Sequence, residues 1–253
     1  MQLTDRVSVV TGGAKGIGLA IAQRLAAEGA VVVLGDVDAE ALDKAAAALD
    51  GPRGGDVLAV QGDLSTREGA ASLVRAARDR FGRVDVLVNN AGGGVIRDTL
   101  AHTEETLRET IDRNLWTTIY CTLEVLPVMI AQNYGRIVNI GAESVRNGLF
   151  QHAIYNAAKG GVHGLTTGLA REFYGNGITV NTVAPSMIAT EQVAHILDDP
   201  NLAPLLDKIT QTIPAGRPGE MTEVASMVAY LASDEATFVT GQVISVNGGS
   251  SML

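Results

Sequence analysis

Hydrophobic positions follow two alternating patterns along the chain. Short, continuous apolar runs rich in valine and isoleucine predict β-strands at residues 6–10, 31–34, 57–61, 84–88, 137–140, 178–183 and 243–246. Between these runs, apolar residues recur every third or fourth position, which is typical of helices with one buried face. These helical patterns lie at residues 17–28, 38–49, 73–81, 104 onward, around 155 and 224–231, with Thr103 as a candidate N-cap.

The order of these elements predicts the fold class. Strands separated by helices of this length pair in parallel through right-handed crossovers. The strands are apolar throughout rather than alternating, as expected when helices cover both faces of the sheet. We therefore expect an α/β protein with a doubly wound, Rossmann-type parallel sheet of about seven strands. Ligands of such sheets bind beyond the carboxyl ends of the strands.

Length and composition fit this fold and exclude some functions. The 253 residues are 46% hydrophobic, and no repeat or linker divides them, which predicts one domain over residues 1–253. The net charge of −9 argues against a nucleic-acid partner, which requires a basic face. The only cysteine, Cys121, lies in an apolar helical pattern and is expected in the core.

The chain also lacks the usual signals for export or membrane insertion. Its first residues are not apolar enough for a signal peptide. Residues 117–129 form an apolar run that Glu124 and Pro127 interrupt. We expect a soluble cytoplasmic protein that neither spans nor binds a membrane, and no metal site.

A glycine-rich turn follows the first predicted strand. It contains Gly12, Lys15, Gly16, Ile17 and Gly18 and opens directly into a helix. Glycines permit a tight turn and let backbone N–H groups approach a pyrophosphate at the helix N-terminus. After the second strand, Asp36 can accept hydrogen bonds from both ribose hydroxyls of an adenosine, which favours NAD. The sequence thus predicts a dinucleotide site.

Asparagines occupy two further positions of interest. Asn89 and Asn90 end the fourth strand, where side-chain amides can tie neighbouring strands together, and Ala91 and Gly92 follow. Asn114 lies inside a long helical pattern although asparagine is a poor helix former, so a specific role is expected there.

Tyr155 and Lys159 are four residues apart in a helical segment and therefore share a face. An ammonium beside a phenol favours the phenolate and lowers its pKa. Moving that pKa about 3 units toward neutrality requires roughly 4 kcal/mol, of which one lysine on the shared face could supply much and a second positive charge nearby the rest. A tyrosine tuned in this way exchanges a proton with an alcohol or ketone near pH 7.

These motifs together resemble those of the short-chain dehydrogenase/reductase family, from Val7 to Gly249. The matching segments are T-G-x-x-x-G-x-G from Thr11, N-N-A-G from Asn89, Y-x-x-x-K from Tyr155, and N-x-x-x-P from Asn181 to Thr190, with Ser186 replacing a usual glycine.

The resemblance implies roles for residues of the site. Tyr155 is the general acid/base, and Lys159 lowers its pKa and binds the nicotinamide ribose. Asn114 holds a water that links Lys159 to solvent. The cofactor contacts implied in addition are Asp63 and Leu64 at the adenine, Asn90, Ala91 and Gly92 beside the cofactor, and Pro185, Ser186, Ile188 and Thr190 near the nicotinamide.

Lys15 complicates the cofactor prediction, because NADP-preferring family members often carry a basic residue at its position. Two like charges about 4 Å apart repel by roughly 4 kcal/mol at a surface-like dielectric, so Asp36 would reject a 2′-phosphate. An exposed lysine pairing contributes only about 0–1 kcal/mol. We therefore predict NAD.

One position departs from the family pattern. Members place a serine where this chain has Ala142, and that serine holds the substrate oxygen. Either the turn is rearranged so that Ser144 supplies the hydroxyl, or Tyr155 alone binds the oxygen. We favour Ser144.

Gly160, Gly164 and Gly168 form a stripe on the helical face opposite Tyr155. Each costs about 1 kcal/mol relative to alanine, so a close backbone approach is expected there. The partner is either a neighbouring helix of the same chain or, as the family's common homotetramer implies, a second subunit.

The sequence therefore predicts an NAD-dependent oxidoreductase for a secondary alcohol or ketone. The alternatives are a 3-oxoacyl-thioester reductase of the same family and a non-catalytic NAD-binding regulator. The substrate itself is not readable. A long irregular segment, residues 186–214, is expected to form a lid, and the remaining pocket residues are expected to be Gly93, Gly94, Ser144, Asn147, Gln151 and His152.

Overall fold

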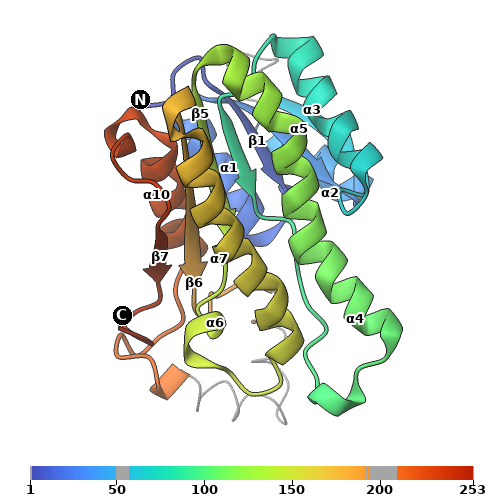
Figure 1. The fold of residues 1–253 in the computed structure, drawn as a ribbon, viewed down its shortest axis with the longest axis vertical. Coiled ribbons are helices and arrows are strands. Elements are labelled where there is room, and N and C mark those ends of the chain that lie inside the picture. Colours follow the sequence, from blue (N-terminus) through green and yellow to red (C-terminus); the bar gives the residue numbers. More distant parts are fainter. Residues whose placement is uncertain (1, 50–56, 192, 194–209, 253) are drawn as a thin grey trace.

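The protein was analysed as a computed structural model that describes residues 2–49, 57–191, 193 and 210–252. Seven parallel strands form one twisted sheet in the order β3-β2-β1-β4-β5-β6-β7 (Figure 1). They are β1 (Val7–Thr11), β2 (Val31–Asp36), β3 (Val57–Gln61), β4 (Val86–Asn89), β5 (Gly135–Ile140), β6 (Ile178–Pro185) and β7 (Val243–Val246). Strands are added toward one edge of the sheet from β1 to β3 and toward the other edge from β4 to β7. This reversal places β1 and β4 at the switch point where such sheets bind ligands.

Helices cover both faces of this sheet. One apolar cluster joins it to α1 (Gly16–Ala27), α2 (Ala39–Leu49) and α10 (Met221–Ala232). A second cluster joins the opposite face to α3 (Arg67–Phe81), α5 (Thr117–Gln132) and α7 (Ala153–Phe173), of which α5 and α7 stand in front of the sheet in Figure 1. The shorter helices are α4 (Glu104–Ile111) and α6 (Ser144–Asn147). The predicted fold class is confirmed.

A π-helical turn, Asp112–Trp116, joins α4 to α5. The combined run Glu104–Gln132 is long and apolar enough to cross a membrane by length and composition. One face of this run, however, packs on the sheet: Cys121, Val125 and Met129 are fully buried. Burial also raises the pKa of the Cys121 thiol to about 12. This run is a core helix, and Cys121 is a core residue as predicted.

The sequence located most elements within one or two residues. Thr103 caps α4 by accepting a hydrogen bond from the backbone of Thr106 (3.3 Å). The strand expected at 84–88 begins later, at Val86, although the backbone of Asp85 already donates to Val7 (2.8 Å) and accepts from Arg136 (2.9 Å). Residues 192 and 194–209, in the expected lid, lie outside the described residues.

Asp85 sits at the amino end of the sheet and is fully buried. Its carboxylate accepts two hydrogen bonds from Arg83 (2.6 and 2.7 Å) and one from the backbone N–H of Val7 (2.9 Å). Arg6 lies 3.5 Å from the same group. Each charge in this cluster has an opposite partner, so ion pairing and hydrogen bonds offset the cost of burying the Asp85 carboxylate.

Candidate active site

The glycine-rich turn leaves β1 and packs against the end of β4. Gly12 has φ of +60°, and a Cβ built on it would lie 2.8 Å from Cα of Ala91. A Cβ on Gly18 would lie 2.0 Å from the carbonyl oxygen of Gly12, so only glycine fits there. Gly16 has φ of +53°, and no atom lies within 4 Å of the Cβ position, so one side of the turn is open.

Asn90 fixes the turn from the side of β4. Its side-chain amide donates to the carbonyl oxygens of Thr11 (3.1 Å) and Gly12 (3.0 Å). Thr11 accepts in return from the backbone N–H groups of Asn90 (3.0 Å) and Ala91 (2.9 Å). Asn89 donates to Asn139 on β5 (2.9 Å). The predicted tying of strands by these two asparagines is present.

Asp36 ends β2 beside the same turn. One carboxylate oxygen accepts from the backbone N–H of Ala14 (3.3 Å), and the other accepts from that of Asp38 (3.2 Å). Lys15 does not bind Asp36; its ammonium lies 2.6 Å from Asp38. That bond and charge raise the pKa of Lys15 and lower the pKa of Asp38. The positive charge that complicated the cofactor prediction is thus already paired.

Asp63 and Leu64 follow β3. The Asp63 carboxylate accepts from the backbone and hydroxyl of Ser65 (3.0 and 2.7 Å), which makes it a turn residue before α3. Leu64 is buried. Both residues stand at the carboxyl edge of the sheet, as the implied adenine contacts require.

Asn114 is fully buried within the π-helical turn. Its amide donates to the carbonyl oxygens of Gly93 (2.8 Å) and Thr110 (2.8 Å), and its oxygen accepts from the N–H of Gly93 (3.2 Å). The turn has one residue more than an α-helical turn, and such insertions occur often at functional sites. Asn114 therefore connects the helix to the loop that follows β4.

That loop brings the expected residues together. A Cβ on Gly92 would lie 2.6 Å from Oδ1 of Asn114 and 3.3 Å from Nζ of Lys159. A Cβ on Gly94 would lie 2.7 Å from the Tyr155 ring. A larger residue at either position would collide with a side chain of this group, because Asn114 and Lys159 lie against Gly92 and Tyr155 lies against Gly94.

Tyr155 and Lys159 share one face of α7 as predicted, with Nζ 5.9 Å from the ring centre. The Lys159 ammonium is buried and donates to the carbonyl oxygen of Ile140 (2.8 Å). Burial lowers the pKa of Lys159 to about 8 and raises the pKa of Tyr155 to about 12. Burial is thus the dominant cause for the chain by itself, and the expectation that Lys159 together with a second positive charge lowers the pKa of Tyr155 stays a prediction.

Ser144 and Ala142 lie in the turn after β5, and both are buried. The Ser144 hydroxyl donates to the side-chain oxygen of Asn156 (2.6 Å), the residue next to Tyr155. Ser144 is thus connected to the helix that carries the tyrosine, while Ala142 has no polar side-chain atom to offer a substrate.

A second loop borders the site between α6 and α7. Gln151 has a left-handed backbone (φ of +64°), and its amide donates to Asp98 (2.8 Å) in the loop after β4. His152 packs edge-on against the Tyr155 ring, with 6.0 Å between ring centres. Its Nδ1 lies 2.7 Å from the carbonyl oxygen of Phe150, which can only accept, so Nδ1 carries the proton.

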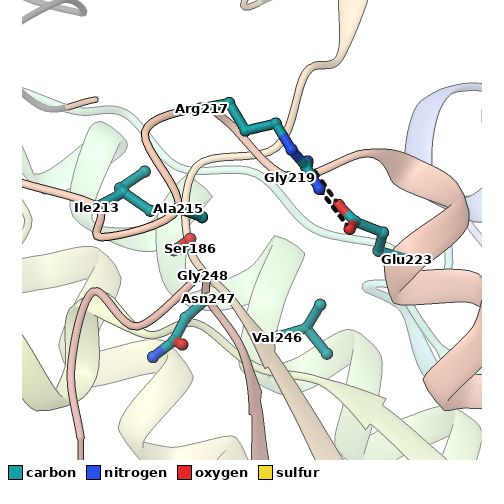
Figure 2. A pocket seen from close by; sticks show the side chains of 9 residues that line it. All are labelled: Ser186, Ile213, Ala215, Arg217, Gly219, Glu223, Val246, Asn247 and Gly248. Carbon is teal, nitrogen blue, oxygen red and sulfur yellow. Dashed lines mark hydrogen bonds and ion pairs between the residues drawn. The ribbon is translucent and has the colours of Figure 1, made fainter. Parts of the chain in front are cut away.

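The segment after β6 continues the carboxyl edge. Ser186 donates its N–H to Val246 (3.2 Å), and Ile188 is buried and bridged to Gly219. Thr190 donates its N–H to Ile188 (2.8 Å). A small pocket of about 70 Å³ opens beside Ser186, between Asn247 and the ion pair of Arg217 with Glu223 (2.7 Å) (Figure 2). It is too small for a dinucleotide, because ligand pockets usually exceed about 300 Å³.

Two features of this region were not predicted from the sequence. Asp38, two residues after Asp36, pairs with Lys15 (2.6 Å). Glu143 is 1% exposed although an acidic residue in a turn normally faces solvent.

Comparison with known proteins defines the class. The family model described as "Enoyl-(Acyl carrier protein) reductase" matches residues 12–251. The chain belongs to the short-chain dehydrogenase/reductase family. It is an oxidoreductase that transfers a hydride between a nicotinamide cofactor and a secondary alcohol or ketone.

Individual relatives narrow the comparison. The chain is 57% identical to a 2,3-dihydroxy-2,3-dihydro-p-cumate dehydrogenase of Pseudomonas putida, over all of this chain and 97% of that protein. It is 39% identical to a 3-oxoacyl-[acyl-carrier-protein] reductase of Synechocystis, over 99% of this chain and 98% of that protein. Among solved structures, levodione reductase superposes with a TM-score of 0.92 at 35% identity, covering 98% of each chain.

Proposed function

We propose that this enzyme is an NAD-dependent dehydrogenase that oxidises a vicinal diol on a dihydroaromatic carboxylic acid. The identity of 57% to a dehydrogenase of such a compound carries the substrate class. The relatives that reduce 3-oxoacyl thioesters are less similar, at 38–39% identity. Family membership and the convergence of Asn114, Tyr155 and Lys159 favour an enzyme over a non-catalytic regulator.

The turn after β1 fits a dinucleotide. Its glycines lack the Cβ atoms that would meet Ala91 and Gly12, and the side next to Gly16 is open. We assign Gly12, Lys15, Gly16, Ile17 and Gly18 to the pyrophosphate end, with further contacts from Asp63, Leu64, Asn90, Ala91, Gly92, Pro185, Ser186, Ile188 and Thr190. The bound cofactor supplies the hydride acceptor and a positive charge near Tyr155.

The preference for NAD rests on two carboxylates. Asp36 ends β2 beside the glycine-rich turn, where its carboxylate would accept hydrogen bonds from the ribose hydroxyls of an adenosine, and Asp38 pairs with Lys15 at 2.6 Å. A 2′-phosphate would meet the Asp36 charge and would have to compete with Asp38 for the only nearby lysine of the turn. Repulsion of roughly 4 kcal/mol at 4 Å is larger than an exposed lysine contact can offset.

The chain's own residues move the proton. Tyr155 accepts the hydroxyl proton of the substrate while the carbinol carbon of the substrate is oxidised. Lys159 orients the site through its bond to Ile140 and, with the cofactor's positive charge, offsets the burial that raises the pKa of Tyr155. Asn114 connects the lysine to the loop at Gly93. Ser144 is the proposed hydroxyl beside the substrate oxygen.

The chemistry of the substrate favours oxidation. Removal of a hydride and a proton from one carbinol of a dihydroaromatic diol leaves a hydroxyketone. Loss of one ring proton and gain of one at oxygen converts it to an aromatic diol, which makes the step hard to reverse. We propose that the enzyme works in this direction in the cytoplasm.

We also propose a homotetramer. Among the described residues, nothing lies within 4 Å of a Cβ built on Gly164 or Gly168, and Gly160 meets only Val145 at 3.8 Å. Packing inside the chain therefore does not explain this stripe. Apolar side chains of α5, such as Leu123 and Ile130, are also exposed. A second subunit would cover both.

Initial rates test the function. Purified enzyme should oxidise a cis-dihydrodiol of a substituted benzoate with NAD⁺ at least tenfold more efficiently than it reduces a 3-oxoacyl thioester. Its kcat/KM should be higher with NAD⁺ than with NADP⁺, and Asp36→Ala should narrow that difference. A higher kcat/KM with NADP⁺ in the wild type would contradict the cofactor assignment, and exclusive activity on thioesters would contradict the substrate class.

A further inference from the structure

The buried carboxylate of Glu143 has no role in the function proposed above. Glu143 directly follows Ala142, at the position next to the missing serine, and is 1% exposed. Burying a charge is costly unless it is paired and hydrogen-bonded. One of its oxygens, Oε2, has no hydrogen-bond partner among the described residues. Such a group requires an explanation.

The other carboxylate oxygen binds the C-terminal tail. Oε1 accepts a hydrogen bond from the hydroxyl of Ser251, which lies 108 residues away in the sequence. The nearest cation, Arg146, lies 3.8 Å from that oxygen, beyond hydrogen-bond distance. The bond from Ser251 is therefore the carboxylate's one hydrogen bond within the described part of the chain.

Neither neighbouring basic residue replaces this bond. Arg146 directs its guanidinium to β7, where it donates to the hydroxyl of Ser245 (2.6 Å) and the carbonyl oxygen of Val243 (2.7 Å). His163 lies behind the turn, beside Gly141, and its Nε2 is buried with no hydrogen-bond partner in the described part of the chain. Burial, together with the charges of Arg146 and Lys159, lowers the pKa of His163 to about 4, so it is neutral at pH 7.

These contacts all converge on residues 141–147, which we call the substrate turn. Glu143 also donates its backbone N–H to Pro185 at the end of β6 (3.0 Å). On the opposite side, Ser144 donates to Asn156 beside Tyr155 (2.6 Å). The tail, β6 and β7 therefore hold the substrate turn from one side, and the helix of the tyrosine holds it from the other.

We propose that Glu143 and Ser251 form a clamp by which the C-terminal tail positions the substrate turn for catalysis. The proposal rests on the proposed function, because it takes the substrate turn to border the reacting carbinol. Ala142 contributes no hydroxyl, so the turn's position decides how the substrate oxygen meets Tyr155. Displacements of about 1 Å in such a wall lower rates by up to about a hundredfold.

Two neighbouring serines provide the test. Ser251 binds Glu143, whereas the hydroxyl of Ser250 is buried without a hydrogen-bond partner among the described residues. Ser251→Ala should lower kcat about tenfold, and the Kd for NADH from fluorescence titration should stay within twofold. Ser250→Ala should leave both unchanged. Glu143→Gln should keep kcat within about threefold, because its amide oxygen still accepts from Ser251, whereas Glu143→Ala should lose about tenfold.

A double variant tests whether the two residues act as a unit. Glu143→Ala with Ser251→Ala should be no slower than Glu143→Ala alone. All rates are compared at a temperature at least 10 °C below the Tm of each variant, so that unfolding does not lower them. Each variant is compared with the wild type on whichever alcohol the wild type oxidises, so an error in the substrate class shows in the wild type alone.

Three results would overturn the clamp. One is a Ser251→Ala variant with kcat within twofold of the wild type. Another is an equal loss for Ser250→Ala and Ser251→Ala, which would make the tail simple packing. The third is strictly multiplicative effects in the double variant.

Discussion

The two ends of the sheet treat buried charge in opposite ways. At the amino end, the carboxylate of Asp85 has bidentate contact with Arg83, a backbone donor at Val7 and a second cation at Arg6. At the carboxyl end, among the described residues, Lys159 donates to one neutral carbonyl oxygen, and Glu143 accepts one hydrogen bond, from a hydroxyl, with Arg146 3.8 Å away. The contacts of Asp85 offset the cost of burying its charge, whereas the few contacts of Lys159 and Glu143 leave more of that cost uncompensated.

This difference separates stability from chemistry. The several fixed contacts of Asp85 tie segments of the amino end together, as expected of a structural group. Lys159, with few contacts and a pKa lowered by burial, is the kind of perturbed group that gathers at functional sites. Substitutions at the amino end should therefore lower stability and leave turnover unchanged. Substitutions at the carboxyl end should lower turnover and leave stability nearly unchanged.

The largest effect is expected from Tyr155→Phe. Removing the phenol oxygen deletes the proposed proton acceptor, and general acid/base groups contribute about 10²–10⁴-fold. We expect kcat to fall about a thousandfold. Because no hydrogen bond joins this oxygen to another described residue, Tm and the Kd for NADH should hardly change. A residual rate within tenfold of the wild type would remove Tyr155 from the mechanism.

Asp85→Ala should have the opposite profile. It leaves two arginine charges and the N–H of Val7 without their buried acceptor, and breaking a buried pair costs about 3–5 kcal/mol. Urea unfolding should show a loss of about 4 kcal/mol, with kcat/KM within twofold at a temperature where the variant is folded. Asp79→Ala is the control, because the exposed pair of Asp79 with Arg78 should contribute less than about 1 kcal/mol.

The pH dependence of stability should reveal the cost at Lys159. Below pH 8 the ammonium is charged in both states, so its burial penalty is fully present. Between about pH 8 and 10.5 the folded state has lost the proton and the unfolded state retains it, so stability rises with pH. Over that window, the unfolding free energy of the wild type should rise by about 3 kcal/mol relative to Lys159→Met.

The comparison with Lys159→Met removes other contributions. Burial raises the pKa of Cys121 to about 12, which makes stability fall above pH 9, but this effect occurs in both proteins. Tyr155 likewise contributes only at higher pH. If the unfolding free energies of the two proteins differ by a constant amount across pH 8–10.5, the folded state does not lower the pKa of Lys159 by burial.

The smallest effect is expected from Ser144→Ala. If the hydroxyl contacts the substrate oxygen, kcat/KM should fall about tenfold, which corresponds to roughly 1.4 kcal/mol. A fall of less than twofold, or roughly 0.5 kcal/mol, would show that Ser144 only braces Asn156. Adding Ala142→Ser to this variant then tests the alternative, since recovery of kcat/KM would mean that the usual serine position still faces the substrate.

The sequence predicted the sheet well because its strands are buried on both faces and read as uninterrupted apolar runs. It also picked out Tyr155 and Lys159, since residue spacing determines which side chains share a helix face. Asn114 was picked out because asparagine is a poor helix former. Spacing carries no information about burial, however. The burial that raises the pKa of Tyr155 in the folded chain was therefore not predicted from the sequence.

Two pairings escaped prediction for a related reason. These are the ion pair of Lys15 with Asp38 and the hydrogen bond of Glu143 with Ser251. In both, the partners are distant in the sequence, and no motif marks them. An acidic residue in a turn is usually solvated, and only the return of the tail over the sheet edge encloses this one. Contacts of that kind depend on the closed fold and have no local signature.

The π-helical turn at Asp112–Trp116 has a further consequence for how α4 and α5 work. Each residue advances a helix by about 100°, so one inserted residue changes the rotational phase of everything on one side relative to the other. The insertion lets α5 direct its apolar side chains to the sheet while α4 faces α7 and the loop after β4. A protein shortened by one residue here would regain a regular helix, but one half would then present the wrong face.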